Sequence, residues 1–561
     1  MPGTEFKHRI QKRDDEPRFS VLELGPRAKR QADISDSDIP KLETPGTLSP
    51  ASRWLDFIPI AFISGLSLAL HLIAIRGFGL FRDELYYIAC SDHLAWGFVD
   101  QPPLSLLLLK GIRFLFGDSA AALRILPALG GAAFVFLTGL MARELGGKKF
   151  AVFVASAAAF APVGNLFQFH VYSMNFIDLL FWQACILIII RLVRTGNPKL
   201  WIPFGIVAGM GLQNKVSLLL LVFGLGVGVL LTKRRQDLRS PYLWLGAALA
   251  ILIFLPYLVW NFAHGWPTLE WMHNAETQKN IKDAPVAFMV GQLLYNNPLS
   301  VLLWLPGLLY FLLHKGGKRY RLFGWASLSL FLLIMILGGK DYYLAGIYPV
   351  LFAGGAVFIE STFRPNTRCL LGAALALLLV VSTLLLSPLA LPVLSVEKTA
   401  AYFERSGISR SQERNEIGVL PQHFADMFGW EEFAATIAGI YETLTPEEQA
   451  GCLIYVRNYG EAAAVDFYGR KYGLPKAACA HNSYWYWGPP EWDGSVAIIM
   501  GDSRDPQTSY ADLSTHFKTV VLAGTTRCDF CMPYENNRAI FLCRRARFSI
   551  QEIWPSEKEF I

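Results

Sequence analysis

The chain has 561 residues, of which 53% are apolar and 17% are charged, and its mean hydropathy is +0.34. Soluble proteins are about 25% charged, so this composition argues against a purely soluble enzyme. The net charge of +6 does not indicate a nucleic-acid-binding domain. Residues 390–561 are acidic, with 16 Lys and Arg against 22 Asp and Glu, and the basic excess lies in the hydrophobic middle.

The N-terminal segment, residues 1–53, is rich in Asp, Arg, Ser and Pro and has no sustained apolar period. Such a segment cannot bury enough apolar surface to offset the loss of chain entropy. The first long apolar run begins only at Phe57, so the segment is not typical of a cleaved signal peptide. We expect a disordered tail.

Apolar runs of about the length that crosses a membrane recur through residues 54–389. They lie at about 57–76, 121–142, 150–164, 172–193, 200–213, 216–232, 241–260, 298–314, 322–338, 345–360 and 369–388. The pattern predicts a polytopic α-helical membrane protein with about eleven transmembrane helices.

The basic residues predict the orientation in the membrane, because Lys and Arg near span ends stay on the cytoplasmic side. Alternate loops hold sixteen Lys and Arg against four acidic residues, whereas the opposite loops hold nine basic and ten acidic residues. The N-terminus is therefore expected to be cytoplasmic. An odd number of spans then places residues 390–561 outside a cell (inner) membrane.

Residues 390–561 change in character from the membrane region. Segments 452–457, 496–500, 519–522 and 539–543 read as short strands, and 429–443 and 460–472 have helical patterns. We expect an extracytoplasmic α/β domain.

The first outer loop, residues 77–120, carries the candidate chemistry. Asp83 and Glu84 are adjacent carboxylates just beyond a span, beside Arg82 and Tyr86, and Asp100 follows in the same loop. Desolvation and a neighbouring like charge can raise the pKa of one carboxyl toward that of a general base. A solvated pair of loop acids is the alternative.

Several motifs in a fixed order resemble the family 39 glycosyltransferases over about residues 55–390. These motifs are Asp83-Glu84 after the first span, Pro102-Pro103-Leu104, Phe176-Ile177-Asp178-Leu179-Leu180-Phe181-Trp182, Gly211-Leu212-Gln213-Asn214-Lys215, Lys340-Asp341-Tyr342-Tyr343-Leu344 and Tyr348-Pro349. The family comprises C-type, multi-pass enzymes and includes protein O-mannosyltransferases and lipid A aminoarabinose transferases.

The resemblance implies transfer of a sugar from a polyprenyl-phosphate carrier to an extracytoplasmic acceptor, usually with inversion at the anomeric carbon. Asp83 would then be the base that takes the acceptor proton, with Glu84 as its partner. The phosphate leaving group needs cations and hydroxyl donors. Candidates for these are Arg82, Lys215, Lys340, Tyr342 and Tyr343, and snorkelling to an interface is the alternative for Lys215.

Three further residues would contribute to substrate binding: Tyr86, Asp100 and Asp178. Asp100 resembles a second loop carboxylate of the aminoarabinose branch, but that branch follows it with Lys where this chain has Gln101. Asp178 would bind a metal or position the acceptor, and pairing with Arg124 or Lys215 is the alternative. The residues define no metal site, and a divalent cation bridging the donor phosphate and Asp83 or Asp178 is compatible with the charges.

The outer region holds three more motifs. Five large aromatic residues within 482–492 suit either stacking on sugars or anchoring at lipid headgroups. Cys528 and Cys531 fit a redox pair, half a zinc site or a disulfide, and a structural disulfide is our expectation. Residues 458–461 follow an expected strand and open a helix, which suits anion binding or an ordinary turn.

The sequence therefore predicts a C-type glycosyltransferase whose partners are a polyprenyl-phosphate sugar (a mannose-like hexose or an aminopentose), the bilayer, and an acceptor that is a protein, a lipid or a cell-envelope glycan. No nucleic acid is expected. A transporter or flippase of lipid-linked sugars is the main alternative, but we find neither the paired repeats nor the matched broken helices that transporters often show. A non-catalytic scaffold is the other alternative.

Overall fold

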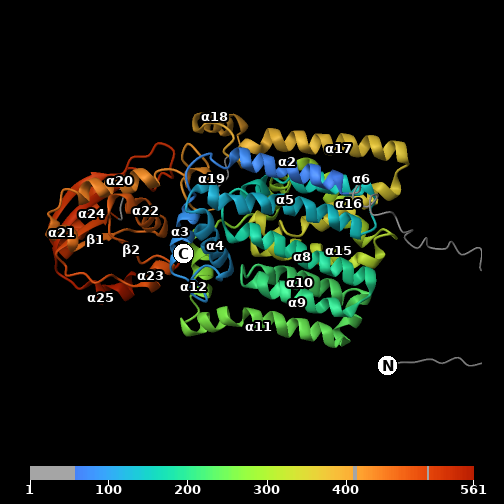
Figure 1. Cartoon of the computed structure of the whole chain (residues 1–561), viewed down its shortest axis with the longest axis horizontal. Helices are drawn as coiled ribbons and strands as arrows, with labels where there is room; N and C mark the ends of the chain where they lie inside the picture. The colour runs from blue at the N-terminus through green and yellow to red at the C-terminus, as the bar shows by residue number, and fades with distance from the viewer. Residues whose placement is uncertain (1–56, 408–412, 502–504) are drawn as a thin grey trace, which may run out of the picture. The chain divides into compact units, whose positions relative to one another are not determined.

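The structure is a computed structural model that describes residues 57–407, 413–501 and 505–561 (Figure 1). The expected disordered tail, residues 1–53, lies outside the described residues.

A helix lies at each of the eleven apolar runs that the sequence singles out. These helices are α2 (Ile58–Ala74), α5 (Ala120–Glu144), α6 (Lys149–Phe160), α8 (Met174–Thr195), α9 (Trp201–Leu212), α10 (Leu218–Leu230), α11 (Pro241–Ala263), α14 (Val301–Leu312), α15 (Arg321–Leu337), α16 (Tyr348–Thr362) and α17 (Pro365–Leu386). Proline begins α11 and α17, where its missing N–H costs nothing. Gly196 and Gly338 end α8 and α15 in the left-handed conformation that glycine adopts freely.

Length and composition let five of the described helices cross a membrane. A sixth span results if Pro285–Tyr295 and Pro298–Leu312, which meet at an angle of 96°, count as one. Four further apolar helices have 10–17 residues. The structure thus confirms a helical protein with several apolar helices of membrane-spanning length, while eleven crossings stays a prediction.

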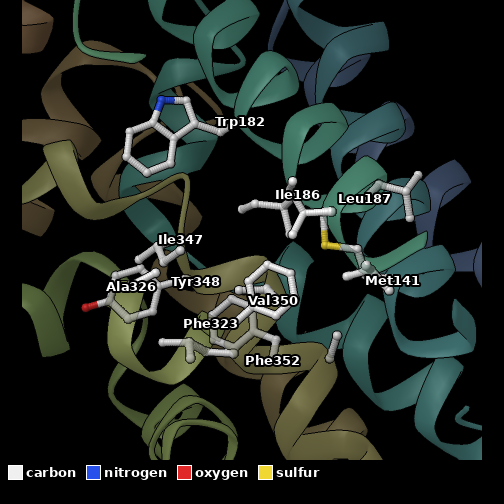
Figure 2. Packing of buried hydrophobic residues seen from close by; sticks show 14 of the residues in the cluster. Met141, Trp182, Ile186, Leu187, Phe323, Ala326, Ile347, Tyr348, Val350 and Phe352 are labelled. Atoms are coloured by element: carbon white, nitrogen blue, oxygen red, sulfur yellow. The ribbon is translucent and has the colours of Figure 1, made fainter. Parts of the chain in front are cut away.

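Close packing joins the helices at glycine contacts and at a buried apolar cluster. A Cβ on Gly205 of α9 would overlap the carbonyl oxygen of Gly246 in α11, so this approach requires glycine. Such small-residue contacts matter in lipid, where apolar burial alone does not drive helices together. Figure 2 shows part of the cluster where α5, α8, α15 and α16 meet, with Met141, Ile186, Leu187, Phe323, Tyr348, Val350 and Phe352 among its members.

Short helices connect the long ones. They are α3 (Arg82–Asp92), α4 (Leu104–Phe116), α7 (Val163–Gln168), α12 (Pro267–Asn274), α13 (Pro285–Tyr295) and α18 (Val396–Ser406), together with short 3-10 segments such as η6 (Asp341–Leu344). Helix α3 begins directly before the Asp-Glu pair, so residues 77–120 contain a helix at the place where the sequence suggested the chemistry.

A five-stranded mixed sheet forms in the C-terminal region, with strand order β2-β1-β3-β5-β4. Its strands are β1 (Cys452–Tyr455), β2 (Ala477–Ala478), β3 (Val496–Met500), β4 (Phe517–Thr525) and β5 (Ala539–Ala546). Strands β1, β2 and β3 are parallel, and β5 is antiparallel to β3 and β4. The four expected strands are confirmed in place, and β2 is an addition.

The helices of this region are α19 (Gln422–Ala425), α20 (Trp430–Tyr441), α21 (Pro446–Ala450), α22 (Tyr459–Tyr468), α23 (Ser483–Trp487), α24 (Pro506–His516) and α25 (Ile550–Ile553). Helix α22 packs against both α20 and α3. Because Leu55–Ile561 forms one compact unit, a separate domain that begins at residue 390 stays a prediction. Its position outside the membrane is likewise untested.

Candidate active site

A cavity of about 460 Å³ lies where the start of α3 meets the C-terminal region. Side chains from distant parts of the sequence line it, and among them are five that the sequence analysis singled out: Arg82, Asp83, Asp100, Lys340 and Tyr342. The structure therefore brings half of the ten expected site residues to one cavity.

Asp83 presents a carboxylate oxygen to this cavity. It lies in the first turn of α3 and its side chain is 37% exposed. Its Oδ1 accepts a hydrogen bond of 3.0 Å from the Tyr459 hydroxyl and lies 3.9 Å from Nε of Arg82. Among the described residues, no hydrogen-bond donor contacts Oδ2. This oxygen is available to accept a proton from a bound molecule.

Glu84 is placed differently from its neighbour. Its side chain is fully buried and does not line the cavity. Nε and Nη2 of Arg124 donate to its two oxygens at 3.1 and 2.7 Å, and the backbone N–H groups of Tyr172 and Phe81 each donate at 2.9 Å. The bond from Phe81 caps the first turn of α3. In this structure Glu84 holds the turn that presents Asp83.

Asp100, which lines the cavity, forms a hydrogen-bonded pair with the buried Tyr86. The Tyr86 hydroxyl donates to Oδ1 of Asp100 at 3.0 Å and accepts from the Ser483 N–H at 3.2 Å. Burial raises the pKa of Asp100 to about 7, although the bond from Tyr86 acts against the rise. Asp100 therefore titrates near neutral pH.

Two lysines share one carboxylate on another wall of the cavity. Nζ of Lys340 lies 2.9 Å and Nζ of Lys279 lies 3.9 Å from Oε1 of Glu413, and Gln422 donates to Oε2 at 3.0 Å. Burial works to raise the pKa of Glu413, but the charges of Lys279, Lys340 and Arg82 hold it down to about 2. The wall is thus an ionised cluster with more positive than negative charge.

Lys215, Asp178 and Tyr343 lie around a small polar pocket of about 10 Å³ that shares Asn175 and Tyr342 with the main cavity. Nζ of Lys215 donates to Oδ1 of Asn175 at 2.6 Å and lies 5.1 Å from the centre of the Tyr342 ring. Oδ2 of Asp178 accepts from the Ser217 hydroxyl at 2.8 Å. Arg124, the alternative partner of Asp178, binds Glu84 instead.

Sequence reasoning missed Lys279 and Glu413, which no motif marks. It also missed the partners of Arg82: Nη1 donates to the Tyr534 oxygen at 2.6 Å, and Nη2 lies 3.7 Å from Oδ2 of Asp426. Burial raises the pKa of Asp426 to about 6, against the opposing charge of Arg82. Tyr459 lies in the motif at 458–461, but nothing in the sequence links Tyr459 or Asp426 to Asp83.

The motif at 458–461 and the aromatic residues within 482–492 make hydrogen bonds and ring contacts within the protein. Oδ1 of Asn458 accepts from the N–H groups of Gly460 and Glu461, so residues 458–461 form a capped helix start. The Tyr486 hydroxyl donates to the carbonyl of His264 at 3.0 Å, and its ring lies near the ring of Trp260.

The expected disulfide is not formed, and Cys528 and Cys531 are free thiols. The backbone N–H of Cys531 lies 3.1 Å from Sγ of Cys528, and the Cys531 thiol points to the carbonyl oxygen of Cys528 at 3.3 Å. The tight turn between them brings the second thiol to a backbone acceptor and also within hydrogen-bonding reach of the first sulfur. Within the described residues, no group of three or more His, Cys, Asp or Glu side chains could hold a metal ion.

Comparison with known proteins found a match to one family model and matches to solved structures. Residues 100–260 match the family model described as dolichyl-phosphate-mannose-protein mannosyltransferase. The crystal structure of ArnT from Cupriavidus metallidurans in the apo state superposes with a TM-score of 0.55 at 14% identity, covering 88% of this chain and 98% of that one. The fold is therefore shared with this structure, and the family match over part of the chain agrees with the resemblance to family 39.

The same relative has also been solved bound to undecaprenyl phosphate, and that structure gives a TM-score of 0.54 at 14% identity over 88% of this chain and 98% of that chain. No curated protein matches the chain. At 14% identity the structural likeness shows the fold alone and leaves the activity and the substrates to be argued from the site.

Proposed function

We propose that this chain is a membrane glycosyltransferase that moves a sugar from a polyprenyl-phosphate carrier to an acceptor outside the cell membrane. The observation that carries the proposal is one cavity that holds both an available carboxylate oxygen, on Asp83, and the lysine pair Lys279 and Lys340. A base and a cation cluster are what transfer from a phosphate leaving group requires. The relative bound to undecaprenyl phosphate supports this class of donor.

Asp83 acts as the general base. Its Oδ2 accepts the proton of the acceptor's hydroxyl or amino group as the acceptor's lone pair bonds to the anomeric carbon. The bond between that carbon and the phosphate oxygen breaks, and polyprenyl phosphate leaves with the bonding electrons. A single displacement of this kind inverts the anomeric configuration.

The negative charge that develops on the phosphate is stabilised by the cations of the cavity. Lys340 and Lys279 supply positive charge directly, Arg82 lies nearby, and the Tyr342 hydroxyl is a hydrogen-bond donor. Glu413 shares the lysines and competes with the phosphate for them.

The remaining predicted residues serve the same reaction from further away. Lys215 and Tyr343 support Tyr342 from the adjoining pocket, and the charge of Asp178 interacts with that of Lys215. Asp100 binds acceptor or sugar hydroxyls in the cavity, with Tyr86 fixing its carboxyl group. Glu84 acts through the backbone that carries Asp83.

The excess of Lys and Arg in alternate loops supports a cytoplasmic N-terminus and an outer C-terminal region from residue 390 onward. Tyr510 lies on α24 and is 46% exposed, so a cysteine at this position suits a topology test. We expect Tyr510→Cys to react with a membrane-impermeant reagent on intact cells. Reaction only after lysis would reverse the orientation.

Donor turnover tests the function directly. Purified protein in lipid is given polyprenyl-phosphate-linked hexoses and aminopentoses, and release of polyprenyl phosphate is followed with and without membrane extract as acceptor. We expect extract-dependent release from at least one donor, loss of this release in Asp83→Asn, and normal release in the exposed control Asp512→Asn. No release from any donor by folded protein would favour a transporter, a flippase or a scaffold.

A further inference from the structure

Two tyrosines whose rings are in contact each donate a hydrogen bond to a different carboxylate of the cavity, Asp83 or Asp100. Tyr459 of α22 donates to Asp83 and Tyr86 of α3 donates to Asp100, both at 3.0 Å, and the two rings lie 4.7 Å apart. Tyr459 thus brings a contact from the C-terminal region to the residue proposed as the base.

The Tyr459 phenol is held firmly in this position. The residue begins α22, whose first turn is capped by Asn458. Its ring packs between those of Tyr86 and His481, and the Arg82 guanidinium lies 5.2 Å from its centre. Burial raises the pKa of the phenol well above its usual value, so the hydroxyl remains a donor at neutral pH.

We propose that Tyr459 is a positioning residue that binds Oδ1 of Asp83 and so presents Oδ2 to the acceptor. The inference rests on the proposed function, in which Asp83 is the base. A hydrogen bond donated to a carboxylate also stabilises its charged form, which is the form that can accept a proton. It acts on the reaction through Asp83.

Other groups around Asp83 contribute to the same balance of charge. Arg82 and Lys279 bring positive charge close to Asp83, Asp100 and Asp426 bring negative charge, and the Tyr87 phenol faces the same space. Removing the Tyr459 hydroxyl leaves all of these in place, so the change in pH dependence reports this one hydrogen bond.

The test is the pH profile of Tyr459→Phe. Loss of the hydrogen bond should move the acidic limb of kcat/KM to higher pH by about one unit, lowering kcat/KM about tenfold on that limb. The KM for the donor should hardly change, because Tyr459 does not contact the lysine pair. Tyr455→Phe is the matched control, since Tyr455 donates to Oε2 of Glu557 at 3.0 Å in the same region and does not line the cavity.

A second variant guards against misfolding. Replacing Tyr459 with 3-fluorotyrosine keeps the ring in place and makes the phenol a stronger donor, so the acidic limb should move to lower pH. Opposite shifts in the two variants, with Tyr455→Phe unchanged, support the inference. An unshifted limb in both, or a loss of activity that is equal at every pH, overturns it. Absence of turnover in the unmodified protein would instead refute the proposed function.

Discussion

Replacing Glu84 with glutamine should destabilise the protein rather than remove its base. The Glu84 carboxylate accepts two hydrogen bonds from Arg124 and two from backbone N–H groups, and both charged side chains are fully buried. A glutamine has one accepting oxygen, so its NH₂ group would face donors. The Arg124 charge would remain buried, with its other hydrogen bonds made to the carbonyls of Gly77 and Gly79.

The magnitude follows from burial. Removing one partner of a buried ion pair costs about 3–5 kcal/mol, because the remaining charge is left uncompensated. Glu448→Gln is the matched control: Glu448 also binds an arginine, Nε of Arg544, at 2.7 Å, but the two side chains are 26% and 33% exposed. An exposed pair contributes about 0–1 kcal/mol, so the control should unfold near the wild-type temperature.

Thermal unfolding of the purified variants, followed by tryptophan fluorescence, measures the difference. We expect Glu84→Gln to unfold several degrees below wild type, and Asp83→Asn to unfold near it while losing turnover. A Glu84→Gln variant that unfolds like wild type and yet lacks turnover would refute this reasoning. It would show that Glu84 takes part in the chemistry, as its place beside Asp83 in the sequence suggested.

Three further outcomes are expected. The folded pKa of Asp100, about 7, lies above that of an unfolded aspartate, so the stability of the wild type should decrease as the pH rises from about 4 to 7. The melting temperature of Asp100→Asn should decrease less over the same pH range, and an equal decrease would contradict this. Lys340→Met should weaken binding of undecaprenyl phosphate about tenfold in a direct binding assay, and unchanged affinity would remove Lys340 from the phosphate site. In protein that is denatured but not reduced, all eight cysteines should react with an alkylating reagent, as counted by mass spectrometry. A pair that does not react would show that Cys528 and Cys531 form the disulfide after all.

The sequence predicts the positions of the helices well because apolar runs, prolines and glycines are local signals. It cannot predict how many helices cross the membrane, since Pro285–Tyr295 and Pro298–Leu312 meet at 96° and this bend depends on their neighbours. Strand β2 has two residues, too few for an alternating pattern, and it exists because β1 pairs with it.

The site is predictable only in part, for physical reasons. Adjacent residues in an α-helix point about 100° apart, so Asp83 faces the cavity while Glu84 turns into the interior. Lys279 and Glu413 meet through a bridge between Asn280 and Glu413, together with a backbone hydrogen bond of 2.9 Å from Arg414 to Lys279. Such a contact joins segments with no regular pattern, so no local signal predicts it.

The turn at residues 458–461 shows how a correct local prediction can miss a functional contact. Asn458 caps the helix as an ordinary strand-to-helix turn requires, but the docking of α22 against α3 gives its neighbours other partners. Tyr459 reaches Asp83, and a Cβ on Gly460 would lie 2.6 Å from Cγ of Arg82, so glycine permits this close approach. A bulkier residue at 460 would therefore push α22 away from Arg82 and lengthen the bond from Tyr459 to the base, although neither residue had been changed.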